Sequence, residues 1–331
     1  MHVTLIRRLR RWPAIGAGLC VALLAVSCSV ISPERPYQPE QHTLRVAATS
    51  SIDSVPLRLG VKRGVFAAEG LDVQVVDSAT DDEVLRAVLD GSADVGLASN
   101  YVMLRRAAGG ARFELQGEAY ACGPDTMALV ALPGRDYEAP TRRPKPVIGI
   151  APGHPFGKLA TRLRLATEGV DPERITFVEM RYAEQISALR SGRIDAAWMT
   201  EPDISKAQKE YGAEVVMDTA RGALLDFPLS SYVAAHDHAR QQPEVYAAFR
   251  RALVKSQELA TNGAVVRAEL SELTGVDPTT TQLVALGTFP TSLNEVRLQR
   301  AADLFYRAGV VSERVDVASM LPQQDGVGAV A

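Results

Sequence analysis

The sequence predicts an α/β fold made of two βαβαβ lobes with a hinge and a central ligand cleft between them. Short apolar stretches of strand length alternate with helical patterns along most of the chain. One series of motifs also occurs twice, about 100 residues apart. With 331 residues and 47% hydrophobic composition, the chain is long and apolar enough to form two packed lobes.

The first unit begins at a buried-strand candidate and shows clear helix boundaries. Ser54 and Pro56 are typical of a helix start, and Glu69-Gly70 is typical of a helix end. In order, we predict a strand at Thr43–Ala48, a helix after Ser54, a strand at Leu71–Val76, a helix from Asp81 to Asp90-Gly91, and strands at Asp94–Ala98 and Phe113–Ala121.

The second unit has the same order of elements. Glu69-Gly70-Leu71-Asp72 matches Glu168-Gly169-Val170-Asp171, and Gly91, Asp94 and Ser99 match Gly192, Asp195 and Thr200. One large, doubly wound sheet is the alternative explanation of this pattern. We predict a strand at Val147–Ile150, a helix at Gly157–Thr167, a strand at Ile175–Glu179, a helix from Ala183 to Gly192, and a strand at Ile194–Met199.

After the second unit, Ser230–Ala235 is predicted to return as a strand to the first lobe. Helical patterns then follow at Pro243–Thr261, Ala264–Leu273, Pro278–Leu286 and Leu293–Ala308. We therefore assign residues 43–121 plus 230–322 to lobe 1 and residues 122–229 to lobe 2, with hinges near Tyr120–Gly123 and Asp226–Ser230.

The N-terminal residues predict export. Four arginines among residues 7–11 precede an uncharged apolar run from Ala14 to Val26, which has the length of a secretory signal and is too short for a membrane span. The run ends at Leu24-Ala25-Val26-Ser27-Cys28, which resembles a bacterial lipobox; an ordinary cleaved signal is the alternative. We expect a lipoprotein signal peptide at residues 1–27, acyl chains such as palmitate on Cys28, a flexible tether at residues 28–42, and a disordered tail at residues 323–331.

Composition and missing motifs argue against several classes of function. The net charge is −3 and no basic stretch is interleaved with aromatic residues, so nucleic acid is not an expected partner. If Cys28 carries lipid, Cys122 has no partner, and no disulfide framework is expected. The sequence contains no HExxH, CxxC or GxSxG motif, so we predict neither catalysis nor a metal or other cofactor.

Short motifs throughout the mature chain resemble those of a known superfamily. They are Gly64-Val65-Phe66, Glu69-Gly70-Leu71-Asp72-Val73 and Gly91-Ser92-Ala93-Asp94-Val95-Gly96 in the first unit, Ala188-Leu189, Gly192-Arg193-Ile194-Asp195-Ala196-Ala197-Trp198 and Glu201-Pro202 in the second, and Gln242-Pro243-Glu244 and Thr274-Gly275-Val276-Asp277 near the C-terminus. Together they resemble the receptors for nitrate, sulfonates, taurine and thiamine precursors, which are type-2 periplasmic binding proteins.

This resemblance implies a non-enzymatic, solute-binding lipoprotein of an ABC importer. It would capture a small organic solute, sulfonate-, taurine- or nitrate-like or thiamine-pyrimidine-like, by closing its lobes. We expect a monomer held by its lipid on the outer face of the cytoplasmic membrane, or facing the periplasm, and working with separate permease and ATPase subunits. A thiamine-pyrimidine-synthase-like enzyme and a sensory or scaffold lipoprotein of the same fold are the alternatives.

Ligands of open parallel sheets bind outside the carboxyl ends of the strands, where helix N-termini present free N–H groups. This rule selects the loops that follow the predicted strands. The candidate ligand-binding residues are Ser50, Ser51, Asp53, Ser99, Asn100 and Tyr101 from lobe 1, and His154, Phe156, Gly157, Arg181, Tyr182, Trp198, Thr200, Glu201 and Asp226 from lobe 2. The hydroxyl and carboxyl groups at helix starts could instead be helix caps.

The charge of the ligand stays open at this point. Arg181 could hold a sulfonate, nitrate or carboxylate with two parallel hydrogen bonds, or it could form an ion pair at the surface. Asp53, Glu201 and Asp226 would suit an amine or an aminopyrimidine better. Trp198 could stack on the ligand or belong to the core.

Overall fold

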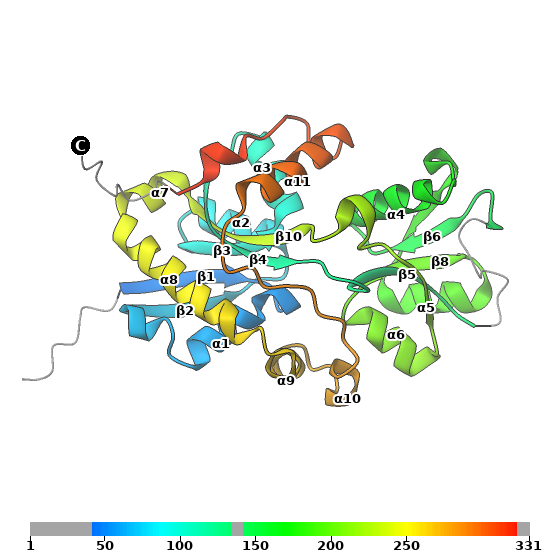
Figure 1. Cartoon of the computed structure of the whole chain (residues 1–331), viewed down its shortest axis with the longest axis horizontal. Coiled ribbons are helices and arrows are strands. Elements are labelled where there is room, and N and C mark those ends of the chain that lie inside the picture. The colour runs from blue at the N-terminus through cyan, green and yellow to red at the C-terminus, as the bar shows by residue number, and fades with distance from the viewer. Residues whose placement is uncertain (1–41, 134–141, 323–331) are drawn as a thin grey trace, which may run out of the picture. The chain divides into compact units, whose positions relative to one another are not determined.

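The computed structural model describes residues 42–133 and 142–322, whose strands form two five-stranded sheets (Figure 1). The α/β fold with two sheets is therefore confirmed, and the alternative of one large sheet is wrong. We call the first sheet with its flanking helices lobe 1 and the second sheet with its helices lobe 2. The predicted signal peptide, Cys28 with its lipid, nearly all of the tether, and the C-terminal tail lie outside the described residues.

The first sheet has the strand order β2-β1-β3-β10-β4. β1 (His42–Ala48) is parallel to both β2 (Leu71–Asp77) and β3 (Val95–Ser99). β10 (Pro228–Ala235) lies between β3 and β4 (Phe113–Ala121) and is antiparallel to both, so the predicted return strand is confirmed. Most residues of β3, β4 and β10 are buried, because helices cover the sheet on both faces.

The second sheet, in the order β7-β6-β8-β5-β9, has the same layout. β7 (Thr176–Glu179), β6 (Val147–Ile150) and β8 (Ala196–Thr200) are parallel, and β5 (Met127–Ala131) lies antiparallel between β8 and β9 (Glu214–Asp218). In each sheet the antiparallel strand is the one that enters directly from the other lobe. The sequence analysis does not predict β5 or β9, because short apolar runs have no diagnostic period.

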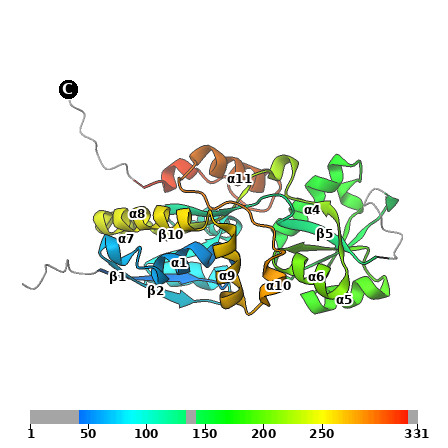
Figure 2. The same cartoon turned by 60° about the horizontal axis from the view of Figure 1, so that its bottom comes forward.

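The helices flank the two sheets in layers. In Figures 1 and 2, α4 covers one face of the second sheet, and α5 and α6 cover the other. The sequence analysis does not predict α3, α6 or α7. The helices are α1 (Val55–Lys62), α2 (Asp81–Leu89), α3 (Asn100–Ala108), α4 (Pro155–Thr167), α5 (Tyr182–Ser191), α6 (Asp203–Tyr211), α7 (His236–Gln241), α8 (Pro243–Leu259), α9 (Gly263–Thr274), α10 (Pro278–Thr281) and α11 (Glu295–Arg307). None of them has both the length and the apolar character that crossing a bilayer requires.

The predicted repeat is confirmed in atomic detail by two aspartates that precede the third strand of each unit. Asp94 Oδ2 accepts a hydrogen bond from the backbone N–H of Arg45 at 2.7 Å. At the corresponding place in lobe 2, Asp195 Oδ2 accepts one from the backbone N–H of Val147 at 2.8 Å. Each aspartate therefore ties the third parallel strand to the first in the same way.

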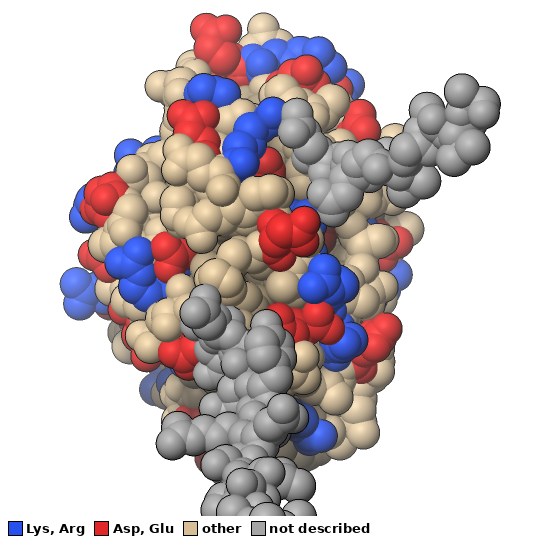
Figure 3. Space-filling view, turned by 90° about the vertical axis from the view of Figure 1, so that its left-hand side faces the viewer, with Lys and Arg blue, Asp and Glu red and all other residues tan. Residues whose placement is uncertain are grey.

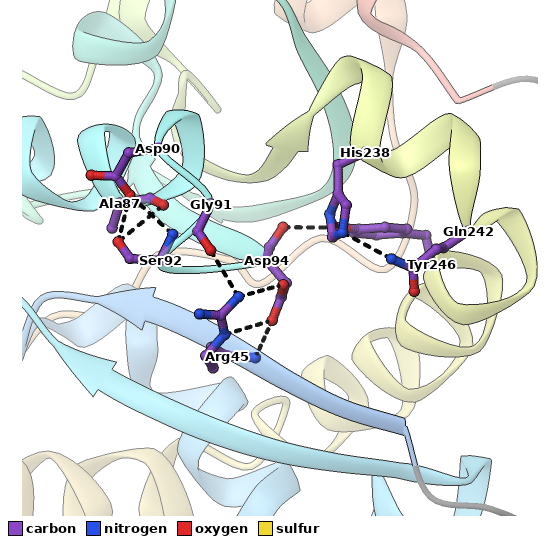
Figure 4. Close-up of polar contacts among 9 residues, drawn as sticks. All are labelled: Arg45, Ala87, Asp90, Gly91, Ser92, Asp94, His238, Gln242 and Tyr246. Carbon is purple, nitrogen blue, oxygen red and sulfur yellow. Dashed lines mark hydrogen bonds and ion pairs between the residues drawn. The ribbon is translucent and has the colours of Figure 1, made fainter.

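Lobe 1 extends this contact into a polar network at the start of β3 (Figure 4). The Arg45 guanidinium forms an ion pair with Asp94, with Nη2 and Oδ1 3.0 Å apart. The Tyr246 hydroxyl donates to the Asp94 carbonyl at 3.0 Å, His238 Nδ1 lies 2.7 Å from that hydroxyl, and Gln242 contacts the other ring nitrogen of His238. The network lies at the opposite end of β3 from the predicted ligand site, so it fastens α7 and α8 to the sheet.

The surface charges of the molecule are mixed in sign. On the face drawn in Figure 3, basic and acidic side chains are interspersed and no large area has a single charge. Many surface charges form salt bridges, as Glu69 does with Lys255 at 2.6 Å and Arg251 at 2.9 Å. Exposed pairs of this kind add little to stability, because water and salt screen them.

Two strand connections lie side by side where the chain passes between the lobes. The backbone N–H of Cys122, just after β4, donates to the carbonyl of Phe227, just before β10, at 3.0 Å. The Cys122 thiol donates to the carbonyl of Leu224 at 2.9 Å. Burial raises the pKa of this thiol to about 11, so it is an unreactive part of the connection.

A third segment, residues 276–288, also contacts both lobes, and we call it the bridging segment. Thr288 exchanges two backbone hydrogen bonds of 2.9 Å with Ala121 of β4. On the lobe 2 side, the N–H of Ala285 in the same segment donates to Glu201 at 2.9 Å. The predicted helix from Pro278 to Leu286 is therefore too long, since α10 ends at Thr281. The N–H groups of Ala285 and Gly287 bond to Glu201 and Tyr120 instead of to helix carbonyls.

The first predicted helix is also shorter than expected. α1 ends at Lys62, and only a short 3-10 turn, Ala67–Glu69, follows before β2. Gly64 has a φ of 71°, a conformation that ends a helix and that glycine adopts without steric cost. The backbone N–H of Val65 then bonds back to the carbonyl of Gly60 at 2.8 Å.

Candidate functional site

A cavity of about 630 Å³ lies where the parallel strands of both sheets end. In lobe 1 it is lined by the loops that follow β1, β2 and β3, and in lobe 2 by the loop after β6 and the end of β8. Phe227 and Leu229, where the chain returns to lobe 1, and Phe305 of α11 complete its wall. The carboxyl-end rule thus selects the same edge in both lobes.

Eight of the predicted site residues line this cavity. Ser99 and Thr200 come from matching positions of the two units, and the cavity joins them as the repeat predicts. The eight are Ser51, Asp53, Ser99 and Tyr101 from lobe 1, and His154, Phe156, Trp198 and Thr200 from lobe 2.

Asn100 and Glu201 do not line the cavity, because both side chains are buried and bonded to backbone elsewhere. Asn100 Nδ2 donates to the carbonyl of Pro228 at 3.0 Å and so ties α3 to β10. The Glu201 carboxylate accepts from the Ser205 hydroxyl and from the N–H of Ala285, both at 2.9 Å. Burial raises the pKa of Glu201, while these hydrogen bonds oppose the rise.

Arg181 and Tyr182 also lie outside the cavity. Arg181 is exposed at the start of α5, where its backbone N–H donates to Glu184 Oε2 at 2.8 Å. The ring of Tyr182 contacts the Lys206 ammonium, 4.9 Å from the ring centroid. The loop after β7 therefore does not reach the cavity, although the corresponding loop of lobe 1 does.

Ser50, Gly157 and Asp226 lie beside lining residues without lining the cavity themselves. Ser50 and Asp226 are exposed to solvent. Gly157 is buried, and a Cβ atom built there would lie 2.6 Å from Cε3 of Trp198. The missing side chain lets α4 pack directly on Trp198, so Gly157 positions a lining residue.

The lobe 1 wall is polar, and it includes Asp81, a lining residue that the sequence analysis did not predict. The Thr49 and Ser51 hydroxyls are 2.9 Å apart, and the Ser51 hydroxyl also donates to Asp53 Oδ1. Asp81, at the start of α2, accepts a hydrogen bond from the N–H of Ser99 at 3.1 Å. Burial raises the pKa of Asp81, and the bonds to Ser99 partly offset this. Applying the carboxyl-end rule to the loop after β2 would have found this residue.

Asp82, the next residue of α2, also lines the cavity but already has cationic partners. Its carboxylate accepts hydrogen bonds from Arg105 Nη2 at 2.7 and 2.8 Å and from Arg106 Nη2 at 2.6 Å. Burial alone would raise the pKa of Asp82, but these hydrogen bonds lower it below its usual value. The charge of Asp82 is therefore balanced within the protein.

The wall on the lobe 2 side is aromatic, and Phe305 of lobe 1 packs against it. The Phe156 ring stacks on Phe227 with centroids 5.3 Å apart and contacts Phe305 edge-on at 5.9 Å. Trp198 meets Phe156 at 88° and donates its indole N–H to the Thr219 hydroxyl at 3.1 Å. Because the rings hold one another in place, they form a preordered surface for a flat ligand.

His154 faces the open cavity at the start of α4. Its ring centroid lies 6.2 Å from that of Trp198. The surrounding protein removes part of its hydration and lowers its pKa, although the charge of Asp81 acts in the opposite direction. At neutral pH the imidazole is therefore neutral, and it can donate or accept a hydrogen bond without bringing a charge.

The described residues contain no group of three His, Cys, Asp or Glu side chains placed to hold a metal ion. The arrangement provides hydroxyl groups, carboxylates, an imidazole and several aromatic rings around one cavity. Such a combination can bind and orient a small molecule.

In a comparison with known families, residues 51–263 match the NMT1/THI5 like family. Among curated proteins, YtlA of Bacillus subtilis (strain 168) is 22% identical to this chain over 217 residues. Its name describes it as a candidate binding protein. That alignment covers 65% of this chain and 64% of YtlA, which is less than two thirds of the relative's length.

Solved structures share the fold over most of the chain. The periplasmic aliphatic sulphonate binding protein SsuA of Escherichia coli has a TM-score of 0.72 at 19% identity, with 85% of this chain and 98% of SsuA covered. The periplasmic nitrate-binding protein NrtA of Synechocystis PCC 6803 has a TM-score of 0.66 at 14% identity, with 85% of each chain covered. The periplasmic-binding-protein fold is therefore confirmed.

Proposed function

Because the chain belongs to the NMT1/THI5 like family and has the fold of periplasmic solute-binding proteins, we propose that it is the solute-binding subunit of an ABC importer. The observation that carries this proposal is the cavity of about 630 Å³ at the strand ends of both lobes. Its volume suits a small organic solute. The sulfonate- or nitrate-like and thiamine-pyrimidine-like classes of solute are the first candidates.

The proposed mechanism is closure of the lobes around the solute. The solute first binds the polar wall of lobe 1, and the aromatic wall of lobe 2 then closes on it by rotation near Tyr120–Gly123 and Asp226–Ser230. Closure is driven only by the free energy that the solute gains in the closed state relative to the open one. The closed complex then docks on separate permease and ATPase subunits.

A lipid anchor on Cys28 completes the proposed role. It would hold the protein on the outer face of the cytoplasmic membrane or facing the periplasm, with residues 28–42 as the tether. Labelling with radioactive palmitate tests this assignment. Undiminished labelling of a Cys28→Ala protein would contradict it.

Binding is a better proposal than catalysis for this cavity. The thiamine-pyrimidine-synthase-like alternative needs reactive groups, but Cys122 is buried, hydrogen-bonded and has a pKa raised to about 11. Iron analysis of the purified protein separates the two roles, since we expect a binding protein to contain no stoichiometric iron. A sensory or scaffold role is tested by deleting the gene and measuring uptake of the identified solute.

A thermal-shift panel tests the binding role directly. It should include sulfonates, taurine, nitrate, aminopyrimidines and flavin-like rings. A solute at about 100 times its Kd adds roughly 2.7 kcal/mol to the free energy of unfolding, which is easily measured. The shift in melting temperature should shrink in a Thr200→Val variant, because this change removes a hydroxyl group from the cavity wall. It should persist in Thr43→Val, a matched control at an exposed position of β1. No shift with any class of compound would contradict the proposal.

A further inference from the structure

The cavity has an unbalanced set of charges. Among the described residues that line it are three carboxylates, Asp53, Asp81 and Asp82, and not one lysine or arginine. Its one imidazole, His154, has a lowered pKa and brings no charge at neutral pH. A sulfonate or nitrate buried here would lack a cationic partner, and burying an unpaired charge is costly.

Two of these carboxylates have no balancing cation. Asp82 is paired with Arg105 and Arg106, but neither arginine lines the cavity. Asp53 and Asp81 form no salt bridge within the part of the chain that the structure describes, and their hydrogen bonds come from the neutral groups Ser51 and Ser99. The charge of Asp53 also contributes to the raised pKa of Asp81, so the two carboxylates share one electrostatic environment.

The helix N-termini at the cavity do not compensate for this. Free N–H groups at such ends can hold an anion, but here protein groups already occupy several of them. Thr80 accepts from the N–H of Glu83, the Ser99 hydroxyl accepts from the N–H of Val102, and Asp81 accepts from the N–H of Ser99 itself. The first residue of α4 is Pro155, which has no N–H.

The opposite wall offers a second preference, for flat rings. Phe156 and Trp198 both line the cavity, with their ring planes at 88° to each other. A planar ligand can stack there, and a cation close to these rings gains further attraction from their π-electrons. Aromatic and acidic groups thus favour one chemical class together.

We propose that the site selects a small planar solute that carries a protonated amine or another cationic group, with its ring against Phe156 and Trp198 and its cation at Asp53 and Asp81. This inference rests on the proposed function, because it names the substrate class of the same cavity. It differs from the sulfonate and nitrate that the names of the structural relatives SsuA and NrtA specify.

Identification of a captured solute tests the inference. The full chain is equilibrated with the small-molecule fraction of a bacterial cell extract, separated from unbound solutes by gel filtration, and denatured, and the released compound is identified by mass spectrometry. A ring-bearing cation or amine is the expected result. A released sulfonate, carboxylate or other net anion overturns the inference but leaves the binding role intact. Release of no compound counts against the binding role and the inference together.

Matched probes and variants then test the two carboxylates. Tryptamine should bind at least tenfold more tightly than indole-3-acetate, which has the same ring and the opposite charge; equal or reversed affinities overturn the inference.

Asp53→Asn and Asp81→Asn should each weaken binding of the cationic probe at least tenfold while keeping the hydrogen bonds from Ser51 and Ser99. Asp90→Asn, the same change of charge at the far end of α2, is the control and should leave the Kd unchanged. Melting temperatures of all variants exclude misfolding, and unchanged binding by both cavity variants rejects the proposed cation site.

Discussion

Lobe 1 and lobe 2 share one strand layout but bring different chemistry to the cavity. The loop after the first parallel strand supplies Ser51 and Asp53 in lobe 1, and the corresponding loop supplies His154 and Phe156 in lobe 2. The sheets depend on buried backbone and apolar contacts, whereas the loops beyond the strand ends are free to differ. A duplicated scaffold can therefore hold a polar wall and an aromatic wall around one cavity.

The loops after the second strand differ even in their reach. Asp81 begins α2 in lobe 1 and lines the cavity, whereas Tyr182 begins α5 in lobe 2 and packs against Lys206 instead. The loops after the third strand remain alike, since Ser99 and Thr200 both line the cavity. The comparison teaches that equivalent positions keep their backbone role more faithfully than their contact with the cavity.

The largest expected effect comes from equivalent residues of the third strands, Leu97 and Trp198. Both are nearly fully buried, at 1% and 4% exposure. We expect Trp198→Ala to cost about 3–5 kcal/mol and Leu97→Ala about 2–5 kcal/mol of unfolding free energy, measured by urea denaturation. Only Trp198→Ala should also remove the thermal shift produced by the solute, because Leu97 does not line the cavity. Loss of binding in both variants would contradict the claim that Trp198 contacts the solute and Leu97 does not.

The next effect concerns the two equivalent aspartates, Asp94 and Asp195. Replacing either by Ala leaves the N–H of the first strand without its side-chain acceptor, a loss of about 1–3 kcal/mol. Asp94→Ala should lie at the upper end, since it also breaks the ion pair with Arg45 at 3.0 Å, whereas Asp195 has only a longer contact of 3.5 Å with Arg143. Urea denaturation measures both, and a larger loss in Asp195→Ala would contradict this ranking. Solute affinity should not change in either variant.

The pH dependence of binding compares the carboxylate of lobe 1 with the imidazole of lobe 2. The pKa of Asp81 is raised, so affinity for a cation is complete above that pKa and falls as the pH drops through it. The pKa of His154 is lowered, and its protonation in acid adds a repelling charge. Protonation of Asp81 removes one of the two carboxylates proposed to hold the cation, so we expect a roughly tenfold weaker Kd in acid, measurable by calorimetry. An anionic solute would show the reverse trend and bind more tightly in acid.

The smallest effect is expected at the contact between lobe 2 and the bridging segment. Lys209 of α6 pairs with Asp277 at 2.6 Å, and this contact lowers the pKa of Asp277. Lys209→Met keeps most of the side chain and should lower the melting temperature only slightly, because exposed ion pairs are screened by water and salt. The difference from the unaltered protein should disappear in high salt. A decrease that persists there would indicate that packing, not charge, holds the segment.

Several features of this protein could be predicted from local sequence alone. Apolar runs, helix-ending glycines and the repeated Asp94 and Asp195 indicate two similar α/β units, because strand burial and chain reversal depend mainly on neighbouring residues. The same information, with the carboxyl-end rule, predicted eight of the residues that line the cavity. It missed β5 and β9, whose pairing depends on strands far away in the chain.

Only the tertiary structure decided which of two neighbouring residues lines the cavity. Ser99 lines the cavity while Asn100 is buried and bonded to Pro228, and Thr200 lines it while Glu201 holds the bridging segment. Consecutive residues at a strand end point in different directions, and distant segments determine which direction leads into the cavity. The sequence alone therefore determined the scaffold, and the packing of the two lobes decided the charge and shape of the space between them.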